Sequence, residues 1–110
     1  MKLPNAENAI IADAKLTEYL LSTTHPEGKD KAVIFYSRGF SLHRLDELRT
    51  GLKNLAMENE VSKTKETIHG MKYLVEGLLE TPDGRGILLR TVWMVDREGT
   101  IPRLVSAYPA

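Results

Sequence analysis

The chain has 110 residues, a length typical of one domain. Its 15 Lys and Arg residues balance its 15 Asp and Glu residues, so the formal net charge is 0 at pH 7. These values exclude a protein that coats nucleic acid by bulk charge, an acidic disordered tail and a collagen-like repeat. They do not exclude a protein in which a few cations bind one phosphate. Because cysteine is absent, disulfides, thiolate metal sites and thiol nucleophiles are also excluded.

The order of the patterns predicts an α+β fold in a single domain over residues 1–110. Helical patterns dominate residues 1–59, and strand patterns dominate residues 60–109. The first residues contain no apolar segment of the kind found in signal peptides, and no apolar run approaches the ~20 residues of a membrane helix. Together with the absence of cysteine, this favours a cytoplasmic protein without a membrane segment.

The first predicted helix follows an irregular or extended segment over residues 1–12. Asp13 is expected to be its N-cap, since an aspartate there accepts a bond from a free first-turn N–H. The helix is expected to run to Leu21. Its buried face is predicted to carry Leu16, Tyr19 and Leu20.

A second helix is predicted over Lys29–Arg38, after a loop at residues 22–28. Gly39 suits the position just beyond a helix end, and Phe40 can make the apolar contact that often accompanies such a stop. The β-prone run at residues 32–36 leaves a strand as an alternative for this segment.

The clearest helix is predicted to begin after Ser41 as its cap. Leucines recur there at spacings of three and four residues, which gives one apolar stripe at the helical period. The stripe consists of Leu42, Leu45, Leu48, Leu52 and Leu55.

Four strands are predicted in the second half, and each short connection contains Gly, Pro or Asp turn residues. Short connections favour antiparallel pairing of sequential strands, so we expect a four-stranded meander with the helices on one face. Alternation places Thr91 with Trp93 on one face of the third strand, and Leu104 with Ser106 and Tyr108 on one face of the last. The four predicted strands are Glu60–Ile68, Met71–Leu79, Ile87–Val95 and Ile101–Tyr108.

The familiar catalytic, nucleotide and metal motifs are absent, including HExxH, CxxC, the EF-hand loop, the Walker loop and GxGxxG. We therefore expect neither a cofactor nor a metal ion.

One candidate site lies at the start of the second predicted helix. His25 precedes it, and Lys29 and Lys31 lie in its opening turn. Free N–H groups, two cations and a histidine that exchanges protons near neutral pH suit a phosphate or phosphodiester. The alternative is a loop histidine beside two solvated lysines.

The predicted sheet adds a second group of polar side chains. Arg90 can hold a phosphate with two parallel bonds, and Tyr108 can stack on a base. Thr91 and Ser106 supply hydroxyls. The alternative is an exposed arginine, a β-favouring threonine and a tyrosine that packs over the edge of the core.

Several segments together resemble a bacterial family of small domains of unknown function. Members occur alone, or at the ends of phage head-morphogenesis-like and polymorphic-toxin-like proteins. The match runs over nearly the whole chain. The segments that carry it are Leu3–Ala9 (LPNAENA), Lys15–Leu21 (KLTEYLL), His25–Ala32 (HPEGKDKA), Gly70–Tyr73 (GMKY), Pro82–Arg85 (PDGR), Arg90–Trp93 (RTVW) and Pro102–Pro109 (PRLVSAYP).

The family is in turn remotely similar to the barnase–EndoU–colicin–RelE class of toxin ribonucleases. That similarity implies cleavage of RNA without metal, by attack of the ribose 2′-hydroxyl on its own phosphate. The site residues it implies are His25, Lys31, Arg90, Thr91, Ser106 and Tyr108. The competing hypothesis is a non-enzymatic interaction module, immunity-like or phage-associated, with a cognate protein partner in place of RNA.

Overall fold

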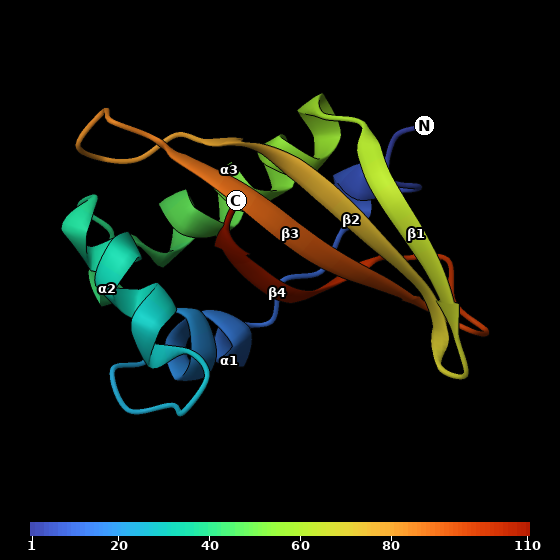
Figure 1. Cartoon of the computed structure of the whole chain (residues 1–110), viewed down its shortest axis with the longest axis horizontal. Coiled ribbons are helices and arrows are strands. Elements are labelled where there is room, and N and C mark those ends of the chain that lie inside the picture. The colour runs from blue at the N-terminus through green and yellow to red at the C-terminus, as the bar shows by residue number, and fades with distance from the viewer.

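Four antiparallel strands form one sheet in sequence order in the computed structural model, which describes residues 1–110 (Figure 1). This order confirms the predicted meander and the α+β class. The observed strands begin and end within about two residues of the predicted bounds. They are β1 (Val61–Thr67), β2 (Gly70–Leu79), β3 (Ile87–Asp96) and β4 (Arg103–Pro109).

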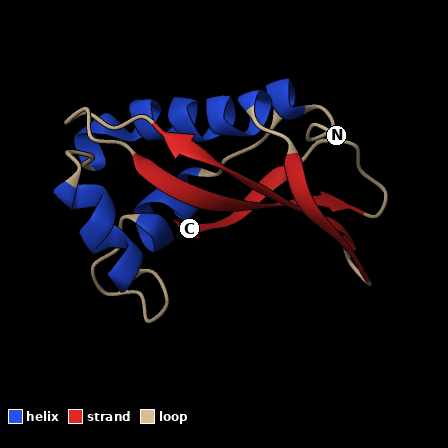
Figure 2. Cartoon of the chain, turned by 45° about the horizontal axis from the view of Figure 1, so that its top comes forward, coloured by secondary structure: helices blue, strands red, loops and turns tan.

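The helices lie on one face of the sheet and at one of its ends (Figure 2). α3 packs against β2 and η1, α1 contacts β4, and η2 contacts α2. In chain order they are η1 (Ala6–Asn8), α1 (Asp13–Lys15), the π-helical η2 (Leu16–Leu20), α2 (Lys29–Ser37), η3 (Leu42–Arg44) and α3 (Leu45–Glu58).

The sequence allows either a helix or a strand at residues 29–38. The segment forms helix α2, so the strand alternative is wrong. Gly39 follows the helix with φ +97°, a conformation that glycine adopts at little cost. Phe40 then packs edge-on against Phe35, with 6.2 Å between ring centroids. The predicted stop at Gly39 and Phe40 is confirmed.

Two details of the helix predictions are wrong. Asp13 is the first residue of α1 and makes no cap, because its carboxylate pairs with the Arg49 guanidinium of α3 instead. Leu42 lies in η3 with 54% of its surface exposed, because the chain enters α3 through a 3₁₀ turn rather than directly from Ser41. The Ser41 hydroxyl does accept a bond from the His43 N–H, at 3.2 Å.

The core lies between the sheet and the helices. Trp93 of β3 and Phe35 of α2 are its largest fully buried side chains. Leucines of η2 and α3 surround them, and Thr91 is the one buried polar side chain. No helix of the chain is long and apolar enough to cross a membrane.

An irregularity in β4 divides its residues between the two faces of the sheet. Leu104 pairs with Trp93, whereas Ser106 pairs with Val92, so β4 has one extra residue between these two pairs. Leu104 therefore lies on the helix-covered face and Ser106 on the open face. The predicted placement of Leu104 with Ser106 and Tyr108 is wrong for this reason, since simple alternation assumes a regular strand.

Candidate functional site

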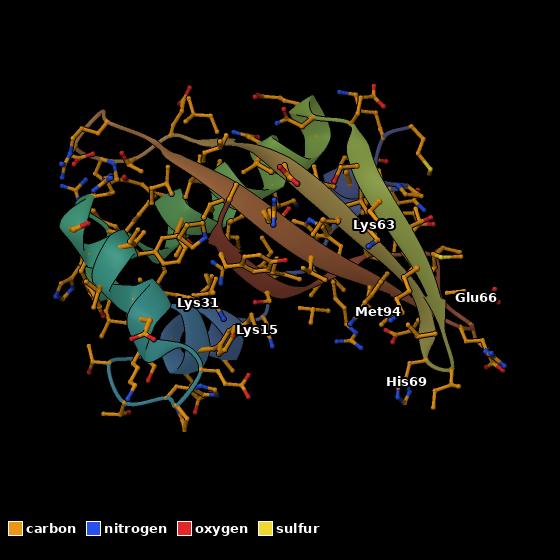
Figure 3. All side chains as sticks on the ribbon, viewed as in Figure 1. Lys15, Lys31, Lys63, Glu66, His69 and Met94 are labelled. Carbon is orange, nitrogen blue, oxygen red and sulfur yellow. The ribbon has the colours of Figure 1, made fainter.

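The hydroxyl of Tyr19 is the centre of a polar cluster beside β4. The Lys31 ammonium donates a hydrogen bond to this hydroxyl, and the Ser106 hydroxyl lies 3.1 Å from it. Lys31 Nζ is also 4.5 Å from the centroid of the Tyr19 ring, and Lys15 Nζ is 5.1 Å from the same centroid. Both lysines thus hold positive charge against one aromatic ring, and Figure 3 shows them on adjacent helical segments.

Three separate elements position this cluster. Tyr19 comes from η2, Lys31 from the first turn of α2 and Ser106 from the open face of β4. Gly28 lets α2 approach η2 closely, because a Cβ at this position would collide with the carbonyl oxygen of Tyr19. The cluster therefore depends on the close packing of the two helices.

His25, in the loop before α2, also belongs to this cluster, because its ring contacts that of Tyr19. Its Nδ1 accepts hydrogen bonds from the N–H groups of Glu27 at 3.0 Å and Gly28 at 3.1 Å. Since Nδ1 is an acceptor, the neutral ring carries its proton on Nε2. The ring meets that of Tyr19 edge-on, with 4.9 Å between centroids.

The surroundings of Tyr19 favour its phenolate form. Partial burial raises the pKa of the phenol, but the hydrogen bonds from Lys31 and Ser106 and the charge of Lys31 together outweigh that effect. The pKa of Tyr19 consequently lies below its usual value of 10.0. A phenol with a lowered pKa gives up its proton more readily, and the resulting phenolate can accept a proton from a substrate hydroxyl.

We expect Tyr19 to ionise below the usual tyrosine pKa of 10.0 when phenolate absorbance is followed. Because the folded pKa is lowered, ionisation stabilises the fold above the usual tyrosine pKa, and this contribution is lost as pH falls through the lowered value. Lys31→Gln removes the largest favourable contact and should move this titration step to higher pH. Lys53→Gln, on α3, should leave it unchanged, and an unchanged step in Lys31→Gln would contradict the assignment.

The structure thus brings together three of the six predicted site residues, His25, Lys31 and Ser106. Arg90 and Tyr108 are cross-strand partners elsewhere on the open face, where Arg90 pairs with the Glu76 carboxylate at 3.1 Å.

Thr91 lies apart from the cluster. Its side chain is fully buried, donates to the Val75 carbonyl at 2.8 Å and accepts from the Trp93 indole N–H at 2.8 Å. The geometry gives Thr91 a structural role in place of the predicted one, because its hydroxyl is already satisfied within the core.

Tyr19 is the member of the polar cluster that sequence reasoning missed. The sequence pattern places it on the buried face of its helix, and its ring does pack at the edge of the core. A signal was present: a tyrosine at the boundary of an apolar face needs a partner for its hydroxyl. Lys15 at position i−4 marks the same side of the helix as polar.

The larger surface hollows lie elsewhere, around α3. One of about 430 Å³ is lined in part by Asp46, Glu47 and Glu80 and by no cationic side chain. Carboxylates repel a phosphate, so this hollow suits an anionic substrate poorly. Another of about 470 Å³ is lined by Asp13, Asp46 and Glu47 together with Arg44 and Arg49, which pair with these carboxylates. No group of three or more His, Asp or Glu side chains is arranged to hold a metal ion.

Fold and cluster together define a small α+β domain in which two helices and an edge strand hold a tyrosine between cations. Residues 2–110 match the family described as domain of unknown function DUF6883, and the chain belongs to that family. No curated protein matches the chain.

A solved structure shares the fold. It is a chain of the contact-dependent growth inhibition toxin–immunity protein complex from Klebsiella pneumoniae 342, with a TM-score of 0.73 and 15% sequence identity. The alignment covers 92% of this chain and 99% of that chain. At this identity the likeness establishes the common fold.

Proposed function

We propose that the chain is a metal-independent endoribonuclease domain of the toxin type. The observation that carries this proposal is the Tyr19 hydroxyl, held between the Lys31 ammonium and the Ser106 hydroxyl with His25 against the ring. A base, a cation and hydrogen-bond donors are the groups that RNA transesterification requires. The toxin–immunity complex that contains the chain of like fold adds support for a toxin-associated role.

In the proposed reaction the 2′-oxygen of a ribose attacks the adjacent phosphorus. The Tyr19 phenolate takes the 2′-hydroxyl proton as the new P–O bond forms. The bond from phosphorus to the 5′-oxygen breaks, that oxygen takes a proton from solvent, and a 2′,3′-cyclic phosphate remains. The Lys31 ammonium stabilises the negative charge that develops on the phosphoryl oxygens, and His25 donates to one of them through Nε2–H.

The remaining predicted residues position the substrate in this proposal. Ser106 fixes the direction of the Tyr19 hydroxyl. Arg90 and Tyr108 contact the RNA away from the cleaved bond, as neighbours on the open face.

The proposal is tested by incubating the purified protein with total RNA in EDTA. We expect the wild-type protein to produce fragments ending in a cyclic phosphate, and His25→Ala to do so about a hundredfold more slowly, as when one transition-state hydrogen-bond donor is removed. His43→Ala, at an exposed histidine of η3, is the matched control and should cleave normally. Absence of cleavage by the wild type, or equal cleavage by His25→Ala, would refute the catalytic assignment.

A second candidate function is an interaction module of the immunity type. The observation in its favour is a cross-strand pair of leucines on the open face, Leu78 and Leu88, which are 60% and 58% exposed. Contiguous exposed apolar surface marks sites of contact between proteins. This candidate predicts harmless expression in bacteria and no RNA cleavage in the EDTA assay, so the same experiment separates the two functions.

A further inference from the structure

We infer that the open face of the sheet is an RNA-binding surface, with Lys63, Lys65 and Lys72 as its phosphate contacts. The identification of the ligand as RNA rests on the proposed function. The location of the surface rests on the register and the charges of the sheet.

Strand pairing places the three lysines on the face that no helix covers. Lys63 pairs with Leu74, and the pairing continues through Val92 to Ser106. Paired residues share one face of a sheet, so this row runs from a lysine on β1 to the serine that contacts Tyr19. With strands ~4.8 Å apart, the row spans roughly 14 Å, which is enough for a short RNA segment.

A second row contains two cations directly opposite each other. Lys65 of β1 pairs with Lys72 of β2, and the row continues through Met94 to Arg103. Like charges directly opposite on neighbouring strands destabilise a sheet. A phosphate between the two ammonium groups would remove this repulsion, so the pair favours an anionic ligand.

The carboxylates of this face do not neutralise the lysines. Glu76 is engaged by Arg90 at 3.1 Å, and Asp96 is engaged by Arg103 at 2.9 Å. No carboxylate lies within ion-pair distance of Lys63, Lys65 or Lys72. A chain with net charge 0 therefore carries excess positive charge on one face, where it can attract a phosphate backbone.

The first row connects this cationic face with the candidate site. Ser106 lies at the end of the first row and contacts the Tyr19 hydroxyl, beyond which lie Lys15 and Lys31. Figure 3 shows Lys63 across the strands from these two lysines. Half-buried Leu74 and Val92 lie in this row between Lys63 and Ser106 and offer apolar surface to the bases. Tyr108, two residues beyond Ser106 on β4, offers one ring on the same face. This continuity with a site suited to phosphodiesters favours RNA over an acidic protein.

The test measures the affinity for a short 2′-O-methyl RNA, which cannot be cleaved because its nucleophilic hydroxyl is blocked. Lys63→Gln/Lys65→Gln is compared with Arg44→Gln/Lys53→Gln, on η3 and α3, which changes the net charge equally away from this face. Two lost phosphate contacts should reduce the slope of log affinity against log salt by about 1.4. Between 50 and 200 mM salt the wild-type affinity should then fall about 7-fold more than that of the first variant, and the control should behave as the wild type.

Equal behaviour of the two double variants would overturn the inference. Poly-L-glutamate serves as the competing probe. If it binds in place of the RNA, or with the same dependence on Lys63 and Lys65, the face recognises an acidic protein or any polyanion. That result would also overturn the inference. Tyr19→Phe should retain RNA binding. Lysine-dependent binding by a wild type that does not cleave RNA would refute the proposed enzyme and leave the RNA-binding surface intact.

Discussion

Replacing Tyr19 by phenylalanine should lower the rate of RNA cleavage about 10²- to 10⁴-fold, the range that a positioned general base contributes. The substitution keeps the ring that packs between His25 and the core, and removes only the hydroxyl that contacts Lys31 and Ser106. The effect should therefore appear in kcat, with little change in RNA affinity. Single-turnover cleavage of a short labelled RNA in EDTA measures it directly.

Tyr36→Phe is the matched control for Tyr19→Phe. The Tyr36 hydroxyl donates one hydrogen bond, to the Leu21 carbonyl at 2.8 Å, and it lies outside the polar cluster. Its loss should cost stability of about 1 kcal/mol and leave cleavage by the folded protein unchanged. Equal activity of Tyr19→Phe and Tyr36→Phe would exclude Tyr19 as the base.

The part of the site that could be predicted is the part encoded locally. His25 and Lys31 lie near each other in sequence, so the start of one helix brings them into the same turn region. The contact between Tyr19 and Ser106 joins residues 87 positions apart. Whether such residues meet depends on how η2 packs beside β4, and no local pattern encodes that packing. The burial of Thr91 could not be predicted for the same reason. Alternation tells which residues share its face of the strand, but not which face of the sheet the helices cover.

The sequence predicts the fold correctly where the apolar residues of an element follow one regular period. It fails where an irregularity such as the extra residue in β4 interrupts that period. The meander follows from four strand patterns joined by short turns, and all four strands are present. The extra residue in β4 leaves no compositional signal, because Leu104, Val105 and Ser106 are all compatible with a regular strand. It nevertheless decides that Ser106 lies on the open face, next to Tyr19, rather than with Leu104 on the core face.

Replacing Leu52 by alanine should lower the free energy of unfolding by about 2–5 kcal/mol. Leu52 is fully buried in the core, so truncation loses its transfer free energy and leaves a cavity. This is a large part of the 5–15 kcal/mol that stabilises an ordinary domain. Urea unfolding followed by Trp93 fluorescence measures the change, since the indole is fully buried in the same core.

Leu42→Ala is the control that separates the two ends of the predicted leucine stripe. Sequence periodicity alone treats Leu42 and Leu52 as equivalent, and both substitutions remove the same atoms. Because Leu42 precedes α3 and is largely exposed, its truncation should change the free energy of unfolding by no more than about 0.5 kcal/mol. A comparable loss in both variants would mean that Leu42 packs into the core and that α3 begins directly after Ser41, as the stripe predicts. A difference of several kcal/mol would place Leu42 outside the buried stripe, in which Leu45 is half-buried and Leu48, Leu52 and Leu55 are buried.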